Sequence, residues 1–248
     1  MKILAMIYSL LCYAIGFAAL VYLILFTGDL VVPWTINASS PFAPELGTGA
    51  AIVWNSILIA IWGAQHSIMA NPHFKAVWTK IVPASVERST YLVFVAAFTA
   101  GLVALWVPMQ AELWNFSDGV IGIILLIGYF AGWTITLIST FLINHFHLFG
   151  LSQAYHAIKQ TQSKQDTFVT PFFYKLVRHP MMTGVLIALW CAPVMTEGRL
   201  LIAIVMSLYI FFGTKHEERT LVADLGQEYE DYRESTPMLI PGTKFGGK

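Results

Sequence analysis

The stretch "RHPMMTG", residues 178–184, places an arginine, a histidine and a proline directly before an apolar run. Pro180 suits the first turn of a helix, where its missing N–H costs nothing and its fixed φ helps. Arg178 and His179 then lie at a helix N-terminus, which carries a partial positive charge and free N–H groups. Gly184, one turn later, permits close approach to the backbone. The pattern predicts a receptor for a carboxylate or another anion.

A pair of adjacent carboxylates, Glu217 and Glu218, follows the last apolar run. Large side chains then recur at roughly helical spacing, predicting an amphipathic C-terminal helix: Leu221, Leu225, Tyr229 and Tyr232. Carboxylates beside a basic helix N-terminus favour a zwitterionic or polyhydroxylated ligand. Its carboxylate would bind the Arg–His pair, and its hydroxyl or amino groups would bind the glutamates. The alternatives are that the arginine reaches lipid phosphates and that the glutamates are solvated on an interfacial helix.

Two histidines form the third group, His66 in "AQHSIMANPHFK" and His145 in "INHFHLFGLSQAYH". Each lies near the end of an apolar run, where an ionisable group is a functional hypothesis by default. A neutral imidazole, with a pKa of about 6.5, could accept a proton near neutral pH. We rank His145 first, because it follows Asn144 and precedes a glycine-containing turn. The alternatives are hydrogen-bonded core histidines, or a facing pair that holds a haem iron axially.

The elements that carry these residues are membrane helices. The 248-residue chain is 57% hydrophobic and only 11% charged, against about 25% charged in a soluble domain. Apolar blocks predict four spans and a final pair that is short for a bilayer and turns at "TEGR": Leu4–Phe26, Ala50–Ala70, Thr90–Met109, Gly119–Ile143, then Met181–Thr196 and Leu200–Lys215. We therefore expect an all-α, polytopic membrane helix bundle with four spans, a C-terminal helical hairpin and an amphipathic C-terminal helix.

Charge sets the expected topology. All but one of the fourteen Lys and Arg residues fall on one side of these spans, and only Arg199 lies across. Lys164 and Lys175 are among the basic residues on the charged side, beyond the fourth span. The positive-inside rule then places both termini in the cytoplasm. Basic charge is scattered, which argues against a nucleic-acid partner.

Cysteine usage points away from disulfide or thiolate chemistry. Cys12 and Cys191 lie singly inside apolar runs, as small buried hydrophobic residues do. Two isolated thiols argue against a disulfide framework and against a cysteine-based metal site. We assign no metal site.

The residues "RHPMMTG" and "EERTLVADLGQEYEDYRESTPMLIP" together resemble the C-terminal signature of the isoprenylcysteine carboxyl methyltransferase superfamily. The upstream pieces "QHSIMANPHFK", "ERSTY" and "INHFHLFGLSQ" resemble one branch of it, the methanethiol S-methyltransferases. The broad signature has Tyr and Phe where this chain has Met182 and Leu225. The methanethiol branch also has an apolar residue at the first of these positions, which favours a small apolar acceptor over a prenylcysteine.

The resemblance implies one membrane methyltransferase domain over residues 1–248, with four spans in 1–143 and a cofactor-binding region in 144–248. It implies an inner-membrane enzyme that binds S-adenosylmethionine from the cytoplasm and methylates a small thiol, most simply methanethiol to dimethyl sulfide. The cofactor-binding residues would be Gln153, Arg178, His179, Pro180, Gly184, Glu217, Glu218, Tyr229 and Tyr232. His145 and His66 would be the candidate bases.

Two alternatives to this assignment stay open. The histidines also resemble those of NnrU-like or carotene-isomerase-like haem-binding membrane proteins. Within the methyltransferases, other small thiols, phospholipid amines and prenylcysteine follow methanethiol as acceptors. The sequence leaves the oligomeric state undetermined.

Overall fold

The computed structural model describes residues 2–161 and 168–243. Lys164, Lys244 and Lys248, which entered the charge argument, lie outside the described residues. The chain divides into two compact units: unit 1 is Met1–Ala111 with Asn144–Thr167, and unit 2 is Glu112–Ile143 with Phe168–Lys248. The cofactor region expected over 144–248 is a functional division and stays a prediction.

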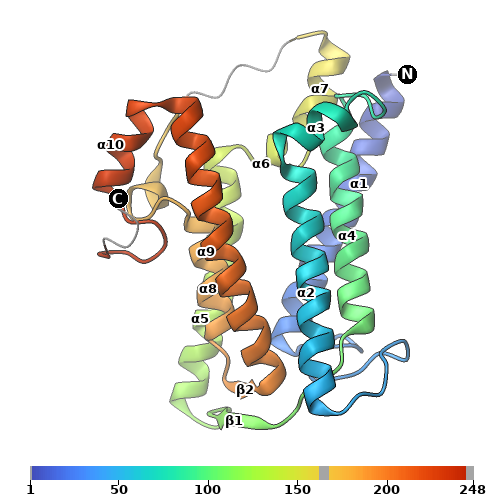
Figure 1. The fold of residues 1–248 in the computed structure, drawn as a ribbon, viewed down its shortest axis with the longest axis vertical. Helices are drawn as coiled ribbons and strands as arrows, with labels where there is room; N and C mark the ends of the chain where they lie inside the picture. The colour runs from blue at the N-terminus through green and yellow to red at the C-terminus, as the bar shows by residue number, and fades with distance from the viewer. Residues whose placement is uncertain (1, 162–167, 244–248) are drawn as a thin grey trace. The chain divides into compact units, whose positions relative to one another are not determined.

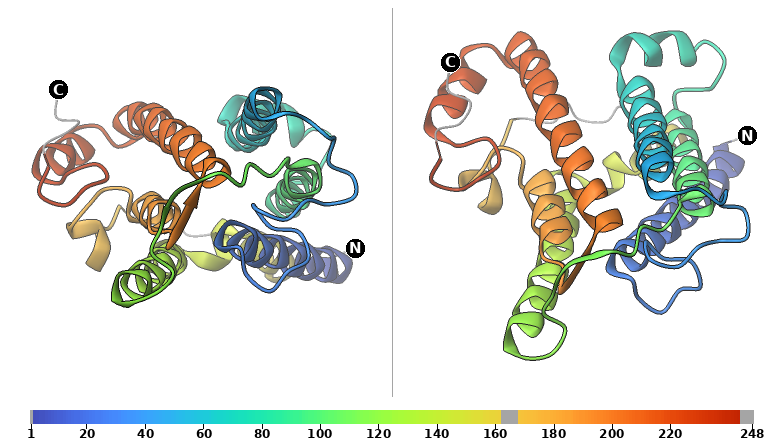
Figure 2. Two further views of the ribbon diagram at one scale, coloured as in Figure 1. Left: turned by 90° about the horizontal axis from the view of Figure 1, so that it is seen from below. Right: turned by 60° about the horizontal axis from the view of Figure 1, so that its bottom comes forward.

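Unit 1 is a row of three long helices with short helices at one end. Its elements are α1 (Lys2–Gly28), α2 (Thr48–Ala70), α3 (Pro72–Trp78), α4 (Glu87–Leu105), α6 (His145–Leu148) and α7 (Leu151–Lys159). Helix α4 lies between α1 and α2 and packs against both (Figures 1 and 2). The two helices α1 and α4 come close at Gly16, where a Cβ would lie 3.3 Å from Leu92 Cβ.

Unit 2 is a second row of helices, closed at one end by a small sheet. Its elements are β1 (Glu112–Asn115), α5 (Val120–Ile143), the 3₁₀ turn η1 (Phe172–Lys175), α8 (Pro180–Trp190), β2 (Val194–Thr196), α9 (Glu197–Leu225) and α10 (Gln227–Ser235). Helix α8 lies between α5 and α9 (Figure 2). The two strands are antiparallel, with Glu112 opposite Thr196 and Asn115 opposite Val194.

The pairing of α5 with α8 depends on glycine. A Cβ on Gly132 would lie 2.5 Å from the Ala188 nitrogen, and a Cβ on Gly184 would lie 2.5 Å from the Gly132 oxygen. Thr136, one turn beyond Gly132, donates a hydrogen bond to the Met181 carbonyl at 3.1 Å. Small residues that let two backbones touch are the usual way to join helices in a membrane, where lipid is as apolar as leucine.

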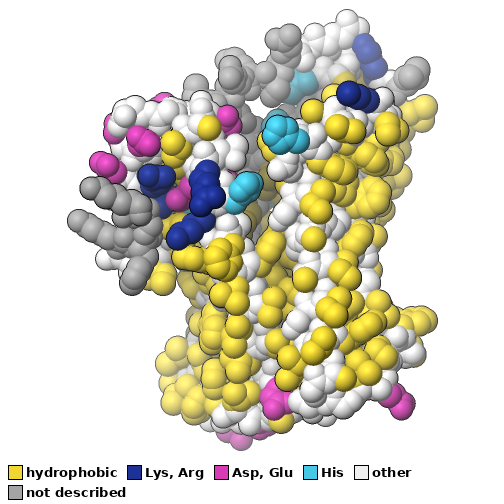
Figure 3. Space-filling view, in the orientation of Figure 1, with side chains coloured by type: hydrophobic (Ala, Val, Ile, Leu, Met, Phe, Trp, Pro, Cys, Tyr) yellow, Lys and Arg dark blue, Asp and Glu magenta, His cyan; other side chains and the backbone are white. Residues whose placement is uncertain are grey.

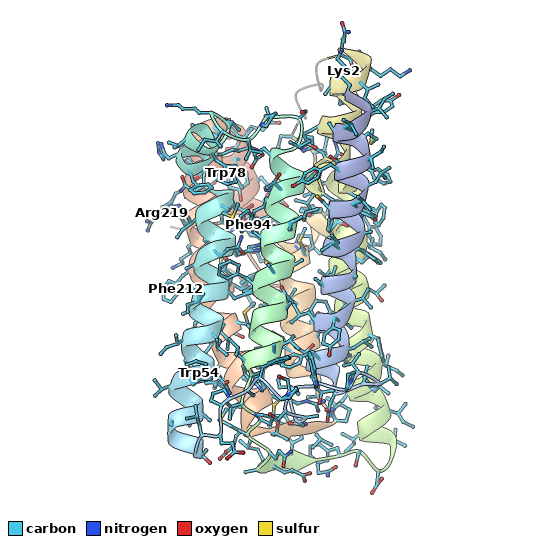
Figure 4. The ribbon with its side chains drawn as sticks, turned by 90° about the vertical axis from the view of Figure 1, so that its right-hand side faces the viewer. Lys2, Trp54, Trp78, Phe94, Phe212 and Arg219 are labelled. Carbon is cyan, nitrogen blue, oxygen red and sulfur yellow. The ribbon has the colours of Figure 1, made fainter. Side chains whose placement is uncertain are left out.

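Among the described residues, five helices are long and apolar enough to cross a membrane: α1, α2, α4, α5 and α9. In each unit hydrophobic side chains cover the middle of the helices, and charged side chains gather at the ends (Figure 3). Trp54 and Trp78 lie near opposite ends of unit 1 (Figure 4), as is typical of aromatic residues at membrane interfaces. The expected all-α, multi-pass membrane bundle is confirmed.

Two boundaries differ from expectation around the C-terminal hairpin. The "TEGR" sequence does not form the turn, because Thr196 caps α9 by accepting a hydrogen bond from the Arg199 nitrogen. The second arm was expected to end at Lys215, but α9 continues to Leu225 and has spanning length. Charged residues ended the apolar run there, yet Lys, Glu and Arg are good helix formers and the helix continues through them.

The single amphipathic C-terminal helix is also a wrong expectation. Gly226, with φ 62° and ψ −135°, ends α9 and begins α10. Leu221 and Leu225 therefore belong to α9, whereas Tyr229 and Tyr232 belong to α10. The third span, expected over Thr90–Met109, ends at Leu105 instead. Pro108 explains that end, because a proline disfavours helical geometry in the residue before it.

Candidate active site

The start of α8 holds a buried charged cluster in unit 2. Pro180 occupies the first helical turn, as expected, and His179 is the N-cap residue. Arg178 Nε donates to Glu218 Oε1 at 2.6 Å, and His179 Nε2 lies 3.1 Å from the same oxygen. The Arg178 and Glu218 side chains are 1% and 6% exposed. The structure therefore brings together residues of α8 and α9 that the sequence separates by about forty positions.

Arg178 also connects the segment after α10 to the start of α8 through hydrogen bonds. Arg178 Nη1 donates to the carbonyls of Arg233, at 2.8 Å, and of Thr236. The backbone N–H of Arg178 donates to the Pro237 carbonyl at 2.9 Å, and that of His179 to Met238 at 3.1 Å. This explains why the sequence "TPMLIP" accompanies "RHP": the two stretches pair along their backbones.

Two groups of the cluster remain available to a ligand. Among the described residues, none pairs with Arg178 Nη2, although this nitrogen is buried. Glu217 is 55% exposed at its side chain and lies 3.7 Å from His179 Nδ1. An unpaired buried guanidinium nitrogen is costly unless something fills its place. The donor and the carboxylate thus fit a ligand that carries both an anionic group and a cationic or hydroxyl group.

Aromatic residues of α10 form a second part of this site. Tyr229 is buried, with its ring centroid 5.8 Å from that of Tyr232, and Phe168 lies 5.8 Å and 5.3 Å from these two rings. Tyr232 Oη donates to the Tyr174 carbonyl at 2.5 Å. Burial raises the pKa of Tyr232 to about 12 and raises the pKa of Tyr229 as well. Both hydroxyls are neutral at physiological pH, and the rings offer apolar faces.

The sequence context of Gly184 suggests that a ligand approaches its backbone, but the structure shows a different close contact. The atoms nearest to its missing Cβ are the Gly132 carbonyl and the Thr136 hydroxyl and nitrogen of α5. What comes close to Gly184 in the structure is therefore a neighbouring helix. Its membership of the cofactor-binding set stays a prediction.

His66 of unit 1 lies near the C-terminal end of α2 in an aromatic setting. Its Nδ1 is 3.1 Å from Tyr91 Oη, and its ring stacks on Trp62 with the centroids 5.2 Å apart. The Arg88 guanidinium lies over the Tyr91 ring at 4.7 Å, and Arg88 Nε donates to the Leu148 carbonyl at 2.8 Å. These contacts fix the imidazole in one orientation.

His145 of unit 1 is 2% exposed at the start of α6 and pairs with a different tyrosine. Its Nε2 lies 3.0 Å from Tyr13 Oη, and its ring lies 4.6 Å from that of Phe149. Burial lowers the pKa of His145 below its ordinary value, so the imidazole is neutral near pH 7 and able to accept a proton. Each of the two histidines thus pairs with a different tyrosine.

Gln153, on α7 of unit 1, donates from Nε2 to the His147 carbonyl at 3.0 Å. Its Oε1 is buried, and the described residues give it no hydrogen-bond partner. Within the described part of the chain, no group of three or more His, Cys, Asp or Glu side chains could hold a metal ion.

Sequence reasoning missed several residues that now stand beside the candidates. Tyr13 lies in a long apolar run, where no pattern distinguishes it, whereas Phe149 and Phe168 lie in segments with polar neighbours that drew attention to other residues. Tyr91 belongs to "ERSTY", a segment quoted above for its resemblance to the methanethiol S-methyltransferases, so a signal for it was present in the sequence. Only the fold shows which histidine each tyrosine meets.

The fold and the site together define a multi-pass membrane enzyme with a preorganised polar cluster at the start of a short helix. Comparison with known proteins specifies the class. The chain is 40% identical to methanethiol S-methyltransferase 1 of Bradyrhizobium diazoefficiens over 240 residues, which cover 97% of this chain and 83% of that protein. It is 40% identical to the methanethiol S-methyltransferase of Mycobacterium tuberculosis, with 97% of each chain covered. The chain belongs to the methanethiol S-methyltransferase family.

A more distant similarity extends to Nurim of Rattus norvegicus, which is 25% identical over 170 residues, 65% of this chain and 64% of that protein. No family model matches the chain. No solved structure matches it. The resemblance drawn from the sequence motifs is thus confirmed by relatives that extend over nearly the full length.

Proposed function

We propose that the chain transfers a methyl group from S-adenosylmethionine to methanethiol and releases dimethyl sulfide. One observation carries the proposal: relatives named methanethiol S-methyltransferase are similar over nearly the whole chain. The buried cluster of Arg178, His179 and Glu218 supports it, because these groups form a polar site that suits a charged methyl donor. A methyl donor follows from the family, and its identity as S-adenosylmethionine is part of the proposal.

The cofactor-binding set is proposed as the sequence motifs imply it: Gln153, Arg178, His179, Pro180, Gly184, Glu217, Glu218, Tyr229 and Tyr232. The unpaired Arg178 Nη2 suits the carboxylate of an amino-acid moiety, and the exposed Glu217 suits ribose hydroxyls or the amino group. The neutral rings of α10 suit a purine base. Arg178 would therefore have two roles. Its Nε and Nη1 form hydrogen bonds with α9 and the C-terminal segment, and only Nη2 is left for the ligand.

When bound, S-adenosylmethionine supplies a methyl group on a cationic sulfur that a thiolate can displace. The chain's own task is then to align the two sulfurs and to exclude water. Alignment is worth roughly 7–11 kcal/mol in favourable cases. A buried neutral imidazole must also take the thiol proton, because the thiolate is the nucleophile. His145 and His66 are the proposed bases, and the pairing of each with one tyrosine supports a fixed orientation.

We also propose that both termini and the cofactor site face the cytoplasm and that the membrane is the cell's inner membrane. The sided distribution of Lys and Arg supports this orientation.

The test is to incubate purified protein with S-adenosylmethionine and methanethiol and to follow dimethyl sulfide by headspace gas chromatography. Turnover that depends on both substrates is the expected result. Cofactor binding without dimethyl sulfide would overturn methanethiol as the acceptor, and neither binding nor turnover in folded protein would overturn the methyltransferase assignment.

Two sets of variants separate the roles. Glu217→Gln should raise the KM for S-adenosylmethionine while leaving that for methanethiol unchanged, because Glu217 is the exposed member of the cluster. His145→Phe or His66→Phe should lower kcat by about 10²–10⁴-fold if that histidine is the base. If both histidine variants keep full kcat, neither residue takes the proton.

A further inference from the structure

A buried glutamine on α2 lacks the partner that its carbonyl oxygen requires. Gln65 is 9% exposed, and its Nε2 donates only to the soft thioether of Met69 at 3.1 Å. Its Oε1 is buried, and no described residue forms a hydrogen bond with it. Gln65 therefore presents an acceptor that the described residues leave unused, near the C-terminal end of a membrane-spanning helix.

The same helix shows what a structural amide looks like. Asn55, three turns earlier on α2, is fully buried and uses both ends of its side chain. Its Nδ2 donates to the Val107 carbonyl at 2.7 Å, and its Oδ1 accepts from the Val107 nitrogen at 3.0 Å. Unpaired polar groups inside a bilayer are expensive and are usually functional. By this contrast, Gln65 is placed for a partner that the described residues do not supply.

The surroundings of Gln65 define the chemistry of that partner. Met69, which Gln65 contacts, packs with Tyr91 and Leu92 in one buried cluster. Tyr91 in turn pairs with His66, the residue that follows Gln65 in the chain. The side-chain amide of Gln65 thus lies beside a thioether that packs with aromatic groups, and Gln65 precedes a candidate base in the chain. A small apolar molecule with one weak donor suits this setting, and a carboxylate does not, because a carbonyl oxygen repels an anion.

We propose that Gln65 Oε1 binds the methyl acceptor in its thiol form by accepting a hydrogen bond from the S–H group; the base then removes that proton from the sulfur, which ends this hydrogen bond. The inference rests on the proposed thiol methylation and assigns it an acceptor-binding residue. Gln65 orients the thiol sulfur, and Met69 and Tyr91 provide the apolar walls around it.

The experiment compares a thiol with a thioether of nearly the same size. Gln65→Leu should raise the KM for methanethiol by about tenfold, as expected for one lost hydrogen bond to a neutral group. The inhibition constant of dimethyl sulfide, which has no S–H, should not change. The KM for S-adenosylmethionine should not change either. A general distortion of the helix would move all three constants together, and that result would overturn the proposal.

A matched control and a second variant complete the test. Ser67→Ala, at an exposed position two residues further along α2, should leave all three constants as they are. If Gln65→Leu does not fold, Gln65→Met gives the same comparison with a side chain of similar length. An unchanged KM for methanethiol in a folded variant overturns the role of Gln65 alone. Wild-type protein that binds S-adenosylmethionine but forms no dimethyl sulfide overturns the proposed function, and the thiol site with it.

Discussion

The charged cluster of unit 2 and the histidine pairs of unit 1 are both buried, but they are built on different principles. Around Glu218 a guanidinium and an imidazole converge on one carboxylate oxygen, at 2.6 Å and 3.1 Å. Around His66 and His145 each imidazole meets one neutral tyrosine hydroxyl, at 3.1 Å and 3.0 Å. The first arrangement compensates charges that could not be buried singly, and the second buries no net charge.

Because of this difference, we expect the removal of one partner to affect the stability of the two regions by different amounts. A buried ion pair is strongly destabilised when one partner is removed, because the remaining charge is left uncompensated. A neutral pair loses only a hydrogen bond. We therefore expect the cluster at Arg178 to control the stability of unit 2, and the histidine pairs to control proton transfer at little cost to the fold.

The largest expected effect is that of Glu218→Ala. Removing this carboxylate leaves Arg178 buried beside an empty position, which should cost about 3–5 kcal/mol of unfolding free energy. Thermal unfolding in detergent measures it. Glu217→Ala is the matched control, because the neighbouring carboxylate is largely exposed and should change stability by no more than about 0.5 kcal/mol. Equal effects of the two variants would mean that the Arg178–Glu218 pair is not the anchor of unit 2.

The next effect concerns the helix contact that positions the charged cluster. Gly184→Ala places a Cβ against the Gly132 carbonyl and should push α8 from α5. Overpacking of this kind costs about 1–3 kcal/mol and should also weaken cofactor binding. Melting temperatures and cofactor titration measure the two effects.

Gly213→Ala is the control for that substitution, because no atom lies within 4 Å of its Cβ position on α9. An alanine there should not destabilise and could add about 0.5–1 kcal/mol through its helix propensity. If Gly184→Ala behaves like Gly213→Ala, the close contact of α5 and α8 does not determine the position of the cluster.

The sequence predicted the positions of the helices better than the residues at which they end. The apolar runs located α1, α2, α4 and α5, because a bilayer requires long uninterrupted apolar segments. The sequence did not show that α9 continues past Lys215 or that Gly226 separates α9 from α10. Those boundaries depend on a capping threonine, on charged residues that continue the helix although they end the apolar run, and on one backbone conformation, none of which a hydropathy pattern predicts.

The candidate site was predictable in part. The sequence motifs that contain Arg178, His179 and Glu218 already showed residues of complementary charge. In the structure these three side chains lie together. The partners of the histidines could not be predicted. Tyr13 and Tyr91 meet His145 and His66 across 132 and 25 residues of sequence, and side-chain pairing at such separations follows from tertiary packing alone.

A smaller effect is expected in the neutral pairs. Tyr91→Phe removes the hydroxyl beside His66 Nδ1 and should cost about 0.5–1.5 kcal/mol, the net value of one hydrogen bond. Melting in detergent measures it beside Glu218→Ala. The difference between the regions disappears if Tyr91→Phe destabilises the protein as much as the loss of the buried carboxylate does.

The smallest effect is a pH dependence at His145. Burial lowers the pKa of this imidazole when folded, and the unfolded chain has the ordinary value of about 6.5. The unfolded state therefore binds more protons below that pH. The contribution of neutral His145 to stability is fully present above pH 6.5 and is lost as the pH falls through the folded pKa, at no more than about 1.4 kcal/mol per pH unit. The melting temperature of wild type should consequently fall more steeply between pH 7 and pH 5.5 than that of His145→Phe. Parallel curves would show that the imidazole binds protons equally in both states, and it would then not be the buried neutral base that thiol deprotonation requires.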